Sequence, residues 1–474
     1  MLSFRSFVSA FVLTTSKAME AALASLKWIY DEAVVVYYSL NLLYVAICMI
    51  AANGIFELWL DIRTRNRLLK GMRNGVPAYL KGMITEETFQ RSNRYNLEVT
   101  SFGMLKSIFS LAIEIAMLYF GFINWSWSFA TNLLEHTPVP VHHITVSILV
   151  IVIMSELTSI TTMPFSVYST FVIEARWNFN NTTWATFILD EAKSRIVGYA
   201  LLCPLMAGAL AIVSALPNNF WLPLWLVLCV IAVAIQFLVV PVFIPIFNKL
   251  SPLPEDREEL QEKLDGIAES VGMKLKKIMV IDGSRRSTKG NAMLAGMFGP
   301  KRVIIYDTML AEMDDDTIAA VIGHELGHHV HNHIPKMLVG GMIKALLMLY
   351  VANRCYLSAR LYNDFGFDTR PPLIGFFVFF QLIDPINMAV DIFDNALSRH
   401  YEYQADRFTV KLGLTGLGAG LVLLSKQNLS DCDPDPLGDF VHSSHPSLAA
   451  RLRELAKAGV DPALFNPGDE KKER

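Results

Sequence analysis

The chain has 474 residues, of which 53% are hydrophobic and only 18% charged, and its formal net charge at pH 7 is −3. Soluble domains average about 25% charged residues, so this composition indicates a membrane protein. Intrinsic disorder is excluded because a disordered chain needs low hydrophobicity and high net charge. The small negative charge gives no electrostatic case for nucleic acid as a partner.

Membrane spans account for the hydrophobic excess. A helix that crosses the bilayer core needs about 20 mostly apolar residues. Runs of this kind occur at 34–55, 102–122, 144–168, 196–216, 220–247, 337–355 and 371–390. We therefore expect a mainly α-helical, polytopic membrane protein with seven transmembrane helices.

Basic residues predict its orientation, because Lys and Arg are enriched in short loops on the cytosolic side. The loop at 56–101 carries eight of them, whereas the loop at 125–141 carries none. We therefore expect a lumenal N-terminus and a cytosolic C-terminus. The predicted units are a lumenal lead-in at 1–33, spans one to five at 34–247 with cytosolic loops 56–101 and 169–195, a cytosolic catalytic region at 248–336, spans six and seven at 337–390, and a cytosolic C-terminal region at 391–474.

The segment 248–336 is expected to fold as a small α+β unit. Residues 254–272 have the pattern of an amphipathic helix, and 277–282 that of a short strand. Residues 291–298 and 301–307 flank a Gly-Pro turn and are predicted to pair as a β-hairpin.

The next helix, predicted over 317–333, carries the clearest chemical motif. Three aspartates precede it and suit its N-terminus. His324 and His328 are four residues apart, so they share one helix face and can bind one metal ion. Glu325 can reach a water molecule held there. This H-E-x-x-H pattern is typical of zincins, in which two His bind zinc and the Glu is the general base.

A catalytic zinc site also needs a third protein ligand and an open position. The five scattered cysteines form no C-x-x-C pair, which leaves His and carboxylates as ligands. The metzincin pattern fails because His331 stands where that pattern needs Gly. Glu402 and Asp406 share a helix face, so Glu402 could bind zinc while Asp406 accepts the outer N–H of a ligand His. The alternative is a solvated acidic face, which we would prefer if the His pair were absent.

Several other histidines accompany the motif. His329, His331 and His333 crowd the same predicted helix, and the first two lie off the ligand face, which favours surface positions. His445 and Arg451 are more suggestive, because zinc hydrolysis develops an oxyanion that imidazole or cationic donors can stabilise. From spacing alone, a helix cap explains this pair equally well.

Together these residues resemble the eukaryotic CAAX prenyl proteases, seven-span zinc endopeptidases of the gluzincin type in the endoplasmic reticulum and inner nuclear membrane. The resemblance covers nearly the whole chain beyond the first thirty residues. The matching stretches are Phe171-Val172-Ile173-Glu174, Phe179-Asn180, Pro252-Leu253-Pro254-Glu255, Gly283-Ser284-Arg285-Arg286-Ser287, Asn291-Ala292, 324–333, Ser398-Arg399 with Glu402, Ala405 and Asp406, and Ser444-His445-Pro446. Bacterial heat-shock relatives share only the metal motifs and have fewer spans, so the seven-span layout favours the eukaryotic family.

The resemblance implies cleavage after the prenylated cysteine of a C-a-a-X protein, which releases the last three residues, with a second upstream cut in some members. It also implies that the spans enclose a water-filled chamber with the zinc facing inward. Carried over by position, His324, His328 and Glu402 would bind one zinc ion, Glu325 would activate water, His445 and Arg451 would support the oxyanion, and Asn291 and Ala292 would lie on the edge strand that pairs with substrate.

We therefore expect a zinc metalloendopeptidase of the endoplasmic reticulum membrane that acts on farnesylated or otherwise prenylated protein C-termini. Polar residues within the spans fit a chamber because they are costly against lipid, although hydrogen bonds between helices would explain them too. They are Glu114, Glu156, Gln236, Gln381, Asp384 and Asn387. The tail at Lys471-Lys472 resembles a retrieval signal, with a solvated charged tail as the alternative.

Three alternatives to this function remain open. The first is a membrane quality-control zinc protease without prenyl specificity, which would use the same chemistry. The second is a seven-span receptor or a zinc transporter that uses the histidine-rich helix. Neither needs Glu402 paired with Asp406, which counts against both. The third is a structural scaffold, which has no use for an ionisable cluster beside the membrane.

Overall fold

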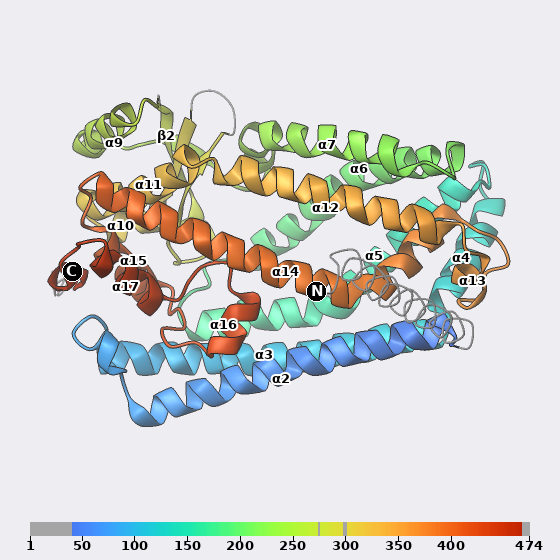
Figure 1. The fold of residues 1–474 in the computed structure, drawn as a ribbon, viewed down its shortest axis with the longest axis horizontal. Helices are drawn as coiled ribbons and strands as arrows, with labels where there is room; N and C mark the ends of the chain where they lie inside the picture. The colour runs from blue at the N-terminus through green and yellow to red at the C-terminus, as the bar shows by residue number, and fades with distance from the viewer. Residues whose placement is uncertain (1–39, 274, 297–300, 467–474) are drawn as a thin grey trace, which may run out of the picture.

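The computed structural model describes residues 40–273, 275–296 and 301–466. Within this part of the chain, seven helices are long and apolar enough to cross a bilayer (Figure 1), which confirms the predicted architecture. They are Leu42–Asn74 (α2), Glu86–Tyr119 (α3), His143–Glu174 (α5 and η2), Trp184–Ala215 (α6), Trp221–Phe247 (α7, η3 and α8), His333–Tyr356 (α12) and Pro372–Lys411 (α14). The expected lead-in at 1–33, the first residues of span one and the Lys471-Lys472 tail lie outside the described residues.

Several spans continue beyond their apolar runs. The helices α2 and α3 extend so far that most of 56–101, expected as a loop, is helical, and only 75–85 connect them. The helix α14 likewise runs unbroken for 40 residues, so no break in the helix marks the expected end of span seven at 390. Hydropathy marks where a helix leaves the lipid and not where its hydrogen bonding stops. The turn after α2 begins at Gly75, whose φ of 73° suits glycine.

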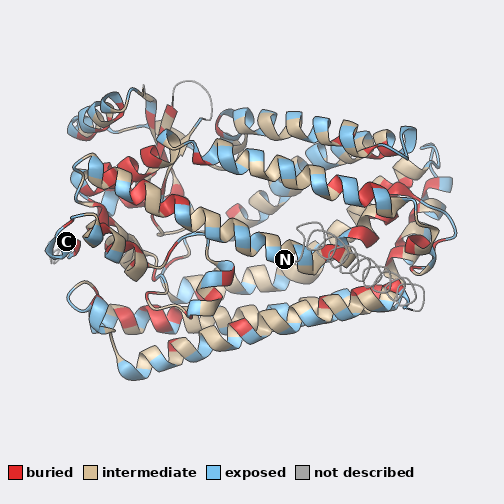
Figure 2. Cartoon of the chain, in the orientation of Figure 1, coloured by how far each residue is buried: buried red, intermediate tan, exposed pale blue. Residues whose placement is uncertain are grey.

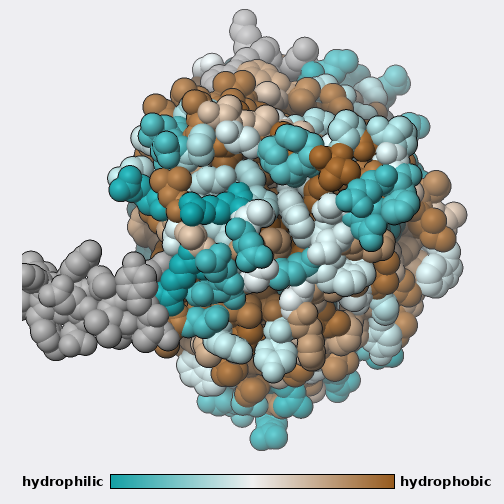
Figure 3. All heavy atoms as spheres, turned by 90° about the vertical axis from the view of Figure 1, so that its right-hand side faces the viewer, coloured by the Kyte–Doolittle hydropathy of each residue, from teal (hydrophilic) through white to brown (hydrophobic). Residues whose placement is uncertain are grey.

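Two short helices cover the end of the bundle expected to be lumenal. The helix α4 (Phe122–Glu135) occupies most of the loop predicted at 125–141, and α13 (Ala359–Asn363) lies near it at the right of Figure 1. Figure 3 looks onto this end, where hydrophilic residues spread among hydrophobic ones. Buried residues concentrate here and around the sheet at the other end, while the middles of the spans are mostly intermediate or exposed (Figure 2).

A four-stranded mixed sheet lies at the opposite end, in the order β1-β2-β4-β3. Its strands are Leu250–Pro252 (β1), Leu275–Ile281 (β2), Ala292–Ala295 (β3) and Lys301–Tyr306 (β4). The strands β3 and β4 pair antiparallel, which confirms the predicted hairpin, although its Gly-Pro turn lies outside the described residues. The strand β2 pairs parallel with β4 and antiparallel with β1, two pairings that the local sequence pattern did not predict. As a result, β3 forms one edge of the sheet.

The helix that carries the His pair packs against this sheet. It is α11 (Asp315–Val330), and Asp314 caps it by accepting the N–H of Thr317 at 2.7 Å. The predicted amphipathic helix at 254–272 is present as η4 (Glu255–Arg257) and α9 (Glu258–Ser270), which packs against α11. The prediction that the metal helix reaches 333 was wrong, because α11 ends at Val330 and Asn332 takes a left-handed conformation with φ 55°.

Two cavities lie among the spans. One of about 270 Å³ between α3, α5 and α14 is lined in part by Glu114 and Gln381. A second of about 350 Å³ is lined by Asp384 and Asn387 of α14 together with residues of α2 and α16 (Pro436–His442). In contrast, Glu156 makes interhelical hydrogen bonds, to Arg195 and Tyr199 of α6. Asp384 does both, because it lines a cavity and also accepts a hydrogen bond from Asn53 of α2 at 2.6 Å. Both explanations of the polar residues in the spans therefore apply.

Candidate metal centre

A close approach between α11 and α14 builds the site. A Cβ added at Gly327 would lie 3.0 Å from Cα of Ala405 and 3.2 Å from its carbonyl oxygen, so any other residue would push the two helices apart by a few tenths of an ångström. His324 projects from α11 and Glu402 from α14, and both are almost fully buried. Two segments more than 70 residues apart in sequence thereby meet at one point.

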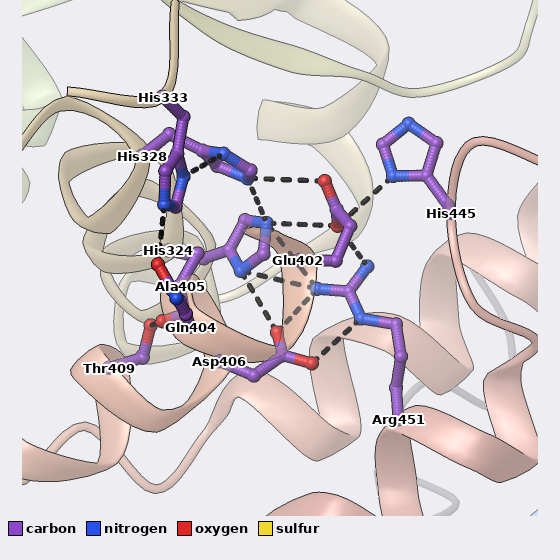
Figure 4. A network of polar contacts seen from close by, with 10 residues as sticks. All are labelled: His324, His328, His333, Glu402, Gln404, Ala405, Asp406, Thr409, His445 and Arg451. Carbon is purple, nitrogen blue, oxygen red and sulfur yellow. Dashed lines mark hydrogen bonds and ion pairs between the residues drawn. The ribbon is translucent and has the colours of Figure 1, made fainter. Parts of the chain in front are cut away.

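Three side chains converge on this point (Figure 4). Nε2 of His324 lies 3.0 Å from Nε2 of His328 and 3.4 Å from Oε2 of Glu402. Oε1 of Glu402 lies 3.2 Å from Nε2 of His328. Within the described part of the chain, this is the one group of three such residues whose ligand atoms lie within 4.8 Å of one another.

The chemistry of this group fits a zinc ion. Oε2 of Glu402 is buried, yet it accepts no hydrogen bond of acceptable geometry from any described residue. A buried carboxylate oxygen without a well-aligned donor is costly, and a metal ion held by these three residues would offset that cost together with the nearby Arg451. Two imidazole nitrogens and one carboxylate form the ligand set of many catalytic zinc sites.

A second carboxylate contacts the other ring nitrogen of His324. Oδ1 of Asp406 lies 2.9 Å from Nδ1 of His324, on the ring edge away from Glu402. Burial and the charge of Arg451 lower the pKa of His324, but hydrogen bonds to Asp406 and Glu402 outweigh them and raise it to about 8. A metal ion bound at His324 would compete with this proton.

Arg451, on α17 (Leu448–Lys457), binds these carboxylates. Its Nε and Nη2 contact the two oxygens of Asp406 at 3.0 and 2.6 Å, and Nη1 lies 3.4 Å from Oε2 of Glu402. Each of its three nitrogens thus faces a carboxylate. In the structure the guanidinium of Arg451, which the sequence predicts to support an oxyanion, is directed at Asp406 and Glu402.

His445 lies at the open side of the centre, in the loop between α16 and α17. Its Nδ1 is 3.0 Å from Oε2 of Glu402, and its side chain is 67% exposed. Glu325 follows His324 on α11 and is half-buried, and among the described residues no hydrogen bond or ion pair engages its carboxylate. Both side chains are therefore available to a substrate or to water.

The outer edge of β3 lies beside α11, and no strand in the described part of the chain pairs with it. The carbonyl of Asn291 accepts the N–H of Tyr306 at 3.0 Å, and the Asn291 side chain accepts the N–H of Ala292 at 2.8 Å. Because hydrogen-bonded and non-bonded pairs alternate in an antiparallel ladder, the carbonyl of Ala292 and the backbone groups of Leu294 point to the open side.

One buried histidine was missed as a partner of the site. His333 is only 1% exposed, and its Nδ1 lies 3.0 Å from Nδ1 of His328. On a continuous helix, five residues would turn it about 140° away from His328. The break at Asn332 brings it back, and the tolerance of Asn for left-handed conformations was the available signal. His331, expected at the surface, is half-buried and stacks near His333.

Comparisons with known proteins agree with this geometry. Residues 65–249 match a family model described as CAAX prenyl protease N-terminal, five membrane helices, and residues 254–458 match peptidase family M48. The chain is 35% identical over 404 residues to CAAX prenyl protease 1 homolog of Arabidopsis thaliana, covering 85% of this chain and 94% of the relative. It is 32% identical over 428 residues to CAAX prenyl protease 1 of Saccharomyces cerevisiae, covering 85% and 93%. The crystal structure of S. mikatae Ste24p matches with a TM-score of 0.83 at 31% identity, covering 87% of this chain and 99% of that one.

Proposed function

The chain belongs to the CAAX prenyl protease family of M48 metallopeptidases, and on that premise we propose that it removes the C-terminal tripeptide from prenylated C-a-a-X proteins. The observation that carries this proposal is the convergence of His324, His328 and Glu402 next to Glu325. His324 and His328 would hold zinc through Nε2, and Glu402 through its carboxylate. With zinc bound, the site gains a Lewis acid that polarises a carbonyl group and makes water easier to deprotonate.

Glu325 is the general base of the proposed reaction. Its carboxylate takes a proton from the water that attacks the scissile carbonyl, and later delivers that proton to the leaving amine nitrogen. Among the described residues no hydrogen bond or ion pair engages the half-buried Glu325 carboxylate, which leaves it accessible to the attacking water and supports this role.

His445 is the candidate donor to the oxyanion, because it is exposed at the open side of the site. Arg451 contributes differently from the expectation based on sequence. It holds Asp406 and Glu402 in place and offsets their negative charge, so we assign it a positioning role.

The substrate backbone would add to the free edge of β3, next to Asn291 and Ala292, as an extra antiparallel strand. This β-augmentation supplies main-chain hydrogen bonds that do not depend on substrate side chains. It suits an enzyme that must hold an extended C-terminal peptide across α11.

We place the chain in the endoplasmic reticulum membrane, or in the continuous inner nuclear membrane, with a lumenal N-terminus and a cytosolic C-terminus. Basic residues that favour this orientation lie in the C-terminal half of α2, and that end of α2 lies at the same end of the bundle as the sheet and α11 (Figure 1). The metal centre would then face the cytosol, where prenylated proteins are delivered to the bilayer.

The test compares a farnesylated peptide with its unprenylated twin, using the purified chain in lipid nanodiscs. We expect release of the tripeptide from the farnesylated peptide only, loss of activity after chelation, and recovery with zinc. Equal cleavage of both peptides would favour a quality-control protease, and activity that survives chelation would refute the zinc mechanism. Product masses from a longer farnesylated peptide test the second, upstream cut.

A further inference from the structure

A chain of side-chain hydrogen bonds leads away from the metal centre behind His328. Nδ1 of His328 lies 3.0 Å from Nδ1 of His333, and Nε2 of His333 lies 3.0 Å from Oε1 of Gln404 (Figure 4). The amide nitrogen of Gln404 continues the chain to Nε2 of His400, at 2.8 Å. His333 comes from α12, and Gln404 and His400 come from α14; none of these three belongs to the H-E-x-x-H motif.

The His333 ring is held firmly in this position. It stacks on Tyr401 with ring centroids 4.2 Å apart and an interplanar angle of 9°. The ring of His331 is also nearly parallel to it, at 5.6 Å and 18°. A ring confined in this way presents a fixed hydrogen-bonding edge to His328.

The donor and acceptor of each hydrogen bond follow from the use of Nε2 of His328 as a metal ligand. Nε2 of His328 faces His324 and Glu402, so a metal ion would take its lone pair there. The proton of the neutral His328 ring must then be on Nδ1, because a neutral imidazole has one donor and one acceptor.

The remaining bonds are determined by this assignment. His333 accepts at Nδ1, carries its own proton on Nε2, and donates to Oε1 of Gln404. The Gln404 amide then donates to His400. Every donor in the chain meets an acceptor, and no other assignment leaves Nε2 of His328 free for a metal ion.

We propose that His333 is a positioning residue of the metal centre, which sets the tautomer and orientation of His328 by accepting its Nδ1–H. This inference rests on the proposed metal site. It gives the two ligand histidines different supports, since Asp406 orients His324 and a neutral imidazole orients His328. The neutral acceptor adds no third buried carboxylate to Glu402 and Asp406, and a further buried negative charge would be costly.

The competing explanation is that His333 only fills space between Tyr401 and α11. Two substitutions separate these roles. His333→Leu fills the space but removes the acceptor, whereas His333→Asn places an acceptor oxygen close to the position of Nδ1. His331→Leu is the matched control, because His331 stacks on the same ring but makes no hydrogen bond to a proposed ligand.

The readouts are zinc affinity, by competition with a chromophoric chelator, and the visible spectrum of the cobalt-substituted protein. We expect His333→Leu to weaken zinc binding by about 10–100-fold, the usual effect of losing such a partner, and to alter the cobalt spectrum. His333→Asn should recover most of the affinity, and His331→Leu should match the wild type. Unchanged affinity and spectrum in His333→Leu, or an Asn variant as weak as the Leu variant, would overturn the inference.

A further variant covers the case in which His333→Leu does not fold. Gln404→Leu leaves His333 in place but removes the acceptor of its Nε2–H. We therefore expect a loss of zinc affinity smaller than that expected for His333→Leu, and an unchanged affinity would count against the inference. Failure of the proposed metal site looks different, because the wild-type chain would then bind no zinc there, whereas failure of the prenyl specificity alone would leave zinc binding intact. A wild type that binds zinc and cleaves peptide, with a His333→Leu variant that does both equally well, refutes only the role of His333.

Discussion

Asp406 lies one helical turn after Glu402 on α14, and its Oδ1 is 2.9 Å from Nδ1 of His324. One helix therefore supplies both a proposed ligand and the residue that orients another ligand. The relationship depends on the spacing of four residues along α14 and on the close packing of that helix against Gly327.

Replacing Asp406 should weaken the metal centre without removing a ligand. In Asp406→Asn the negative charge behind His324 is lost, and Arg451 loses its partner. We expect zinc affinity to fall by about 10–100-fold, measured by chelator competition. The control is Asp256→Asn, at an exposed position of η4, which should bind zinc like the wild type. Equal affinity in both variants would contradict the orienting role of Asp406.

Removing the general base should separate binding from catalysis. Glu325→Gln keeps the size of the side chain but cannot accept a proton from water, so we expect normal zinc content and no detectable cleavage of a farnesylated peptide. Metal analysis and peptide hydrolysis on the same sample check this result. Glu312→Gln, at an exposed position of α10 (Asp307–Glu312), is the matched control. Turnover retained by Glu325→Gln would exclude Glu325 as the base.

The open edge of β3 makes a prediction about substrate binding. Leu294→Pro removes a backbone N–H that points away from β4, while Leu294→Ala keeps that N–H and removes a similar amount of side chain. Since one hydrogen bond contributes about 0.5–1.5 kcal/mol, we expect KM of the Pro variant to exceed that of the Ala variant by up to about tenfold. Zinc content should not differ. If the two variants share one KM, substrate does not pair at this position.

Asp431, which lies outside the metal centre, should make the folding stability of the protein depend on pH. Burial, together with the charges of Asp433 and Asp439, raises the pKa of Asp431 to about 6, although it accepts the N–H of Asp433 at 3.1 Å. The folded protein therefore binds this proton more tightly than the unfolded chain, and stability falls as pH rises from about 4 to about 6.

The variant Asp431→Asn keeps the acceptor oxygen but has no carboxyl group to ionise, so its stability should not fall as pH rises through this range. We expect it to be more stable than the wild type above pH 6, by on the order of 1–3 kcal/mol, and to match the wild type near pH 4. Thermal unfolding in detergent at several pH values measures the difference. A difference that does not change with pH would contradict the raised pKa.

Local features of the fold and the site could be read from sequence. The spacing of His324 and His328 determines that they share a helix face wherever α11 lies, because helix geometry depends on neighbouring residues alone. The seven apolar runs predicted the spans for a similar reason, since each run must be long enough on its own to cross the bilayer. The hairpin of β3 and β4 also followed from residues close together in the chain.

Other features depended on contacts between distant segments. Hydropathy could not show that α14 continues through Glu402, because a helix that leaves the lipid stays helical where protein covers it. The direction of Arg451 depends on where α17 docks against Asp406. The position of His333 depends on a single left-handed residue, Asn332.

The sequence by itself determined the class of chemistry, through the H-E-x-x-H spacing, and the membrane setting, through seven apolar runs. Only the tertiary structure decided which side chains complete and support the site. Periodicity predicts the face of a helix that a residue occupies, but the neighbour of that face is determined by packing across the whole chain. Glu402 meets His324 because Gly327 lets two helices touch, and His333 meets His328 because the backbone turns between them.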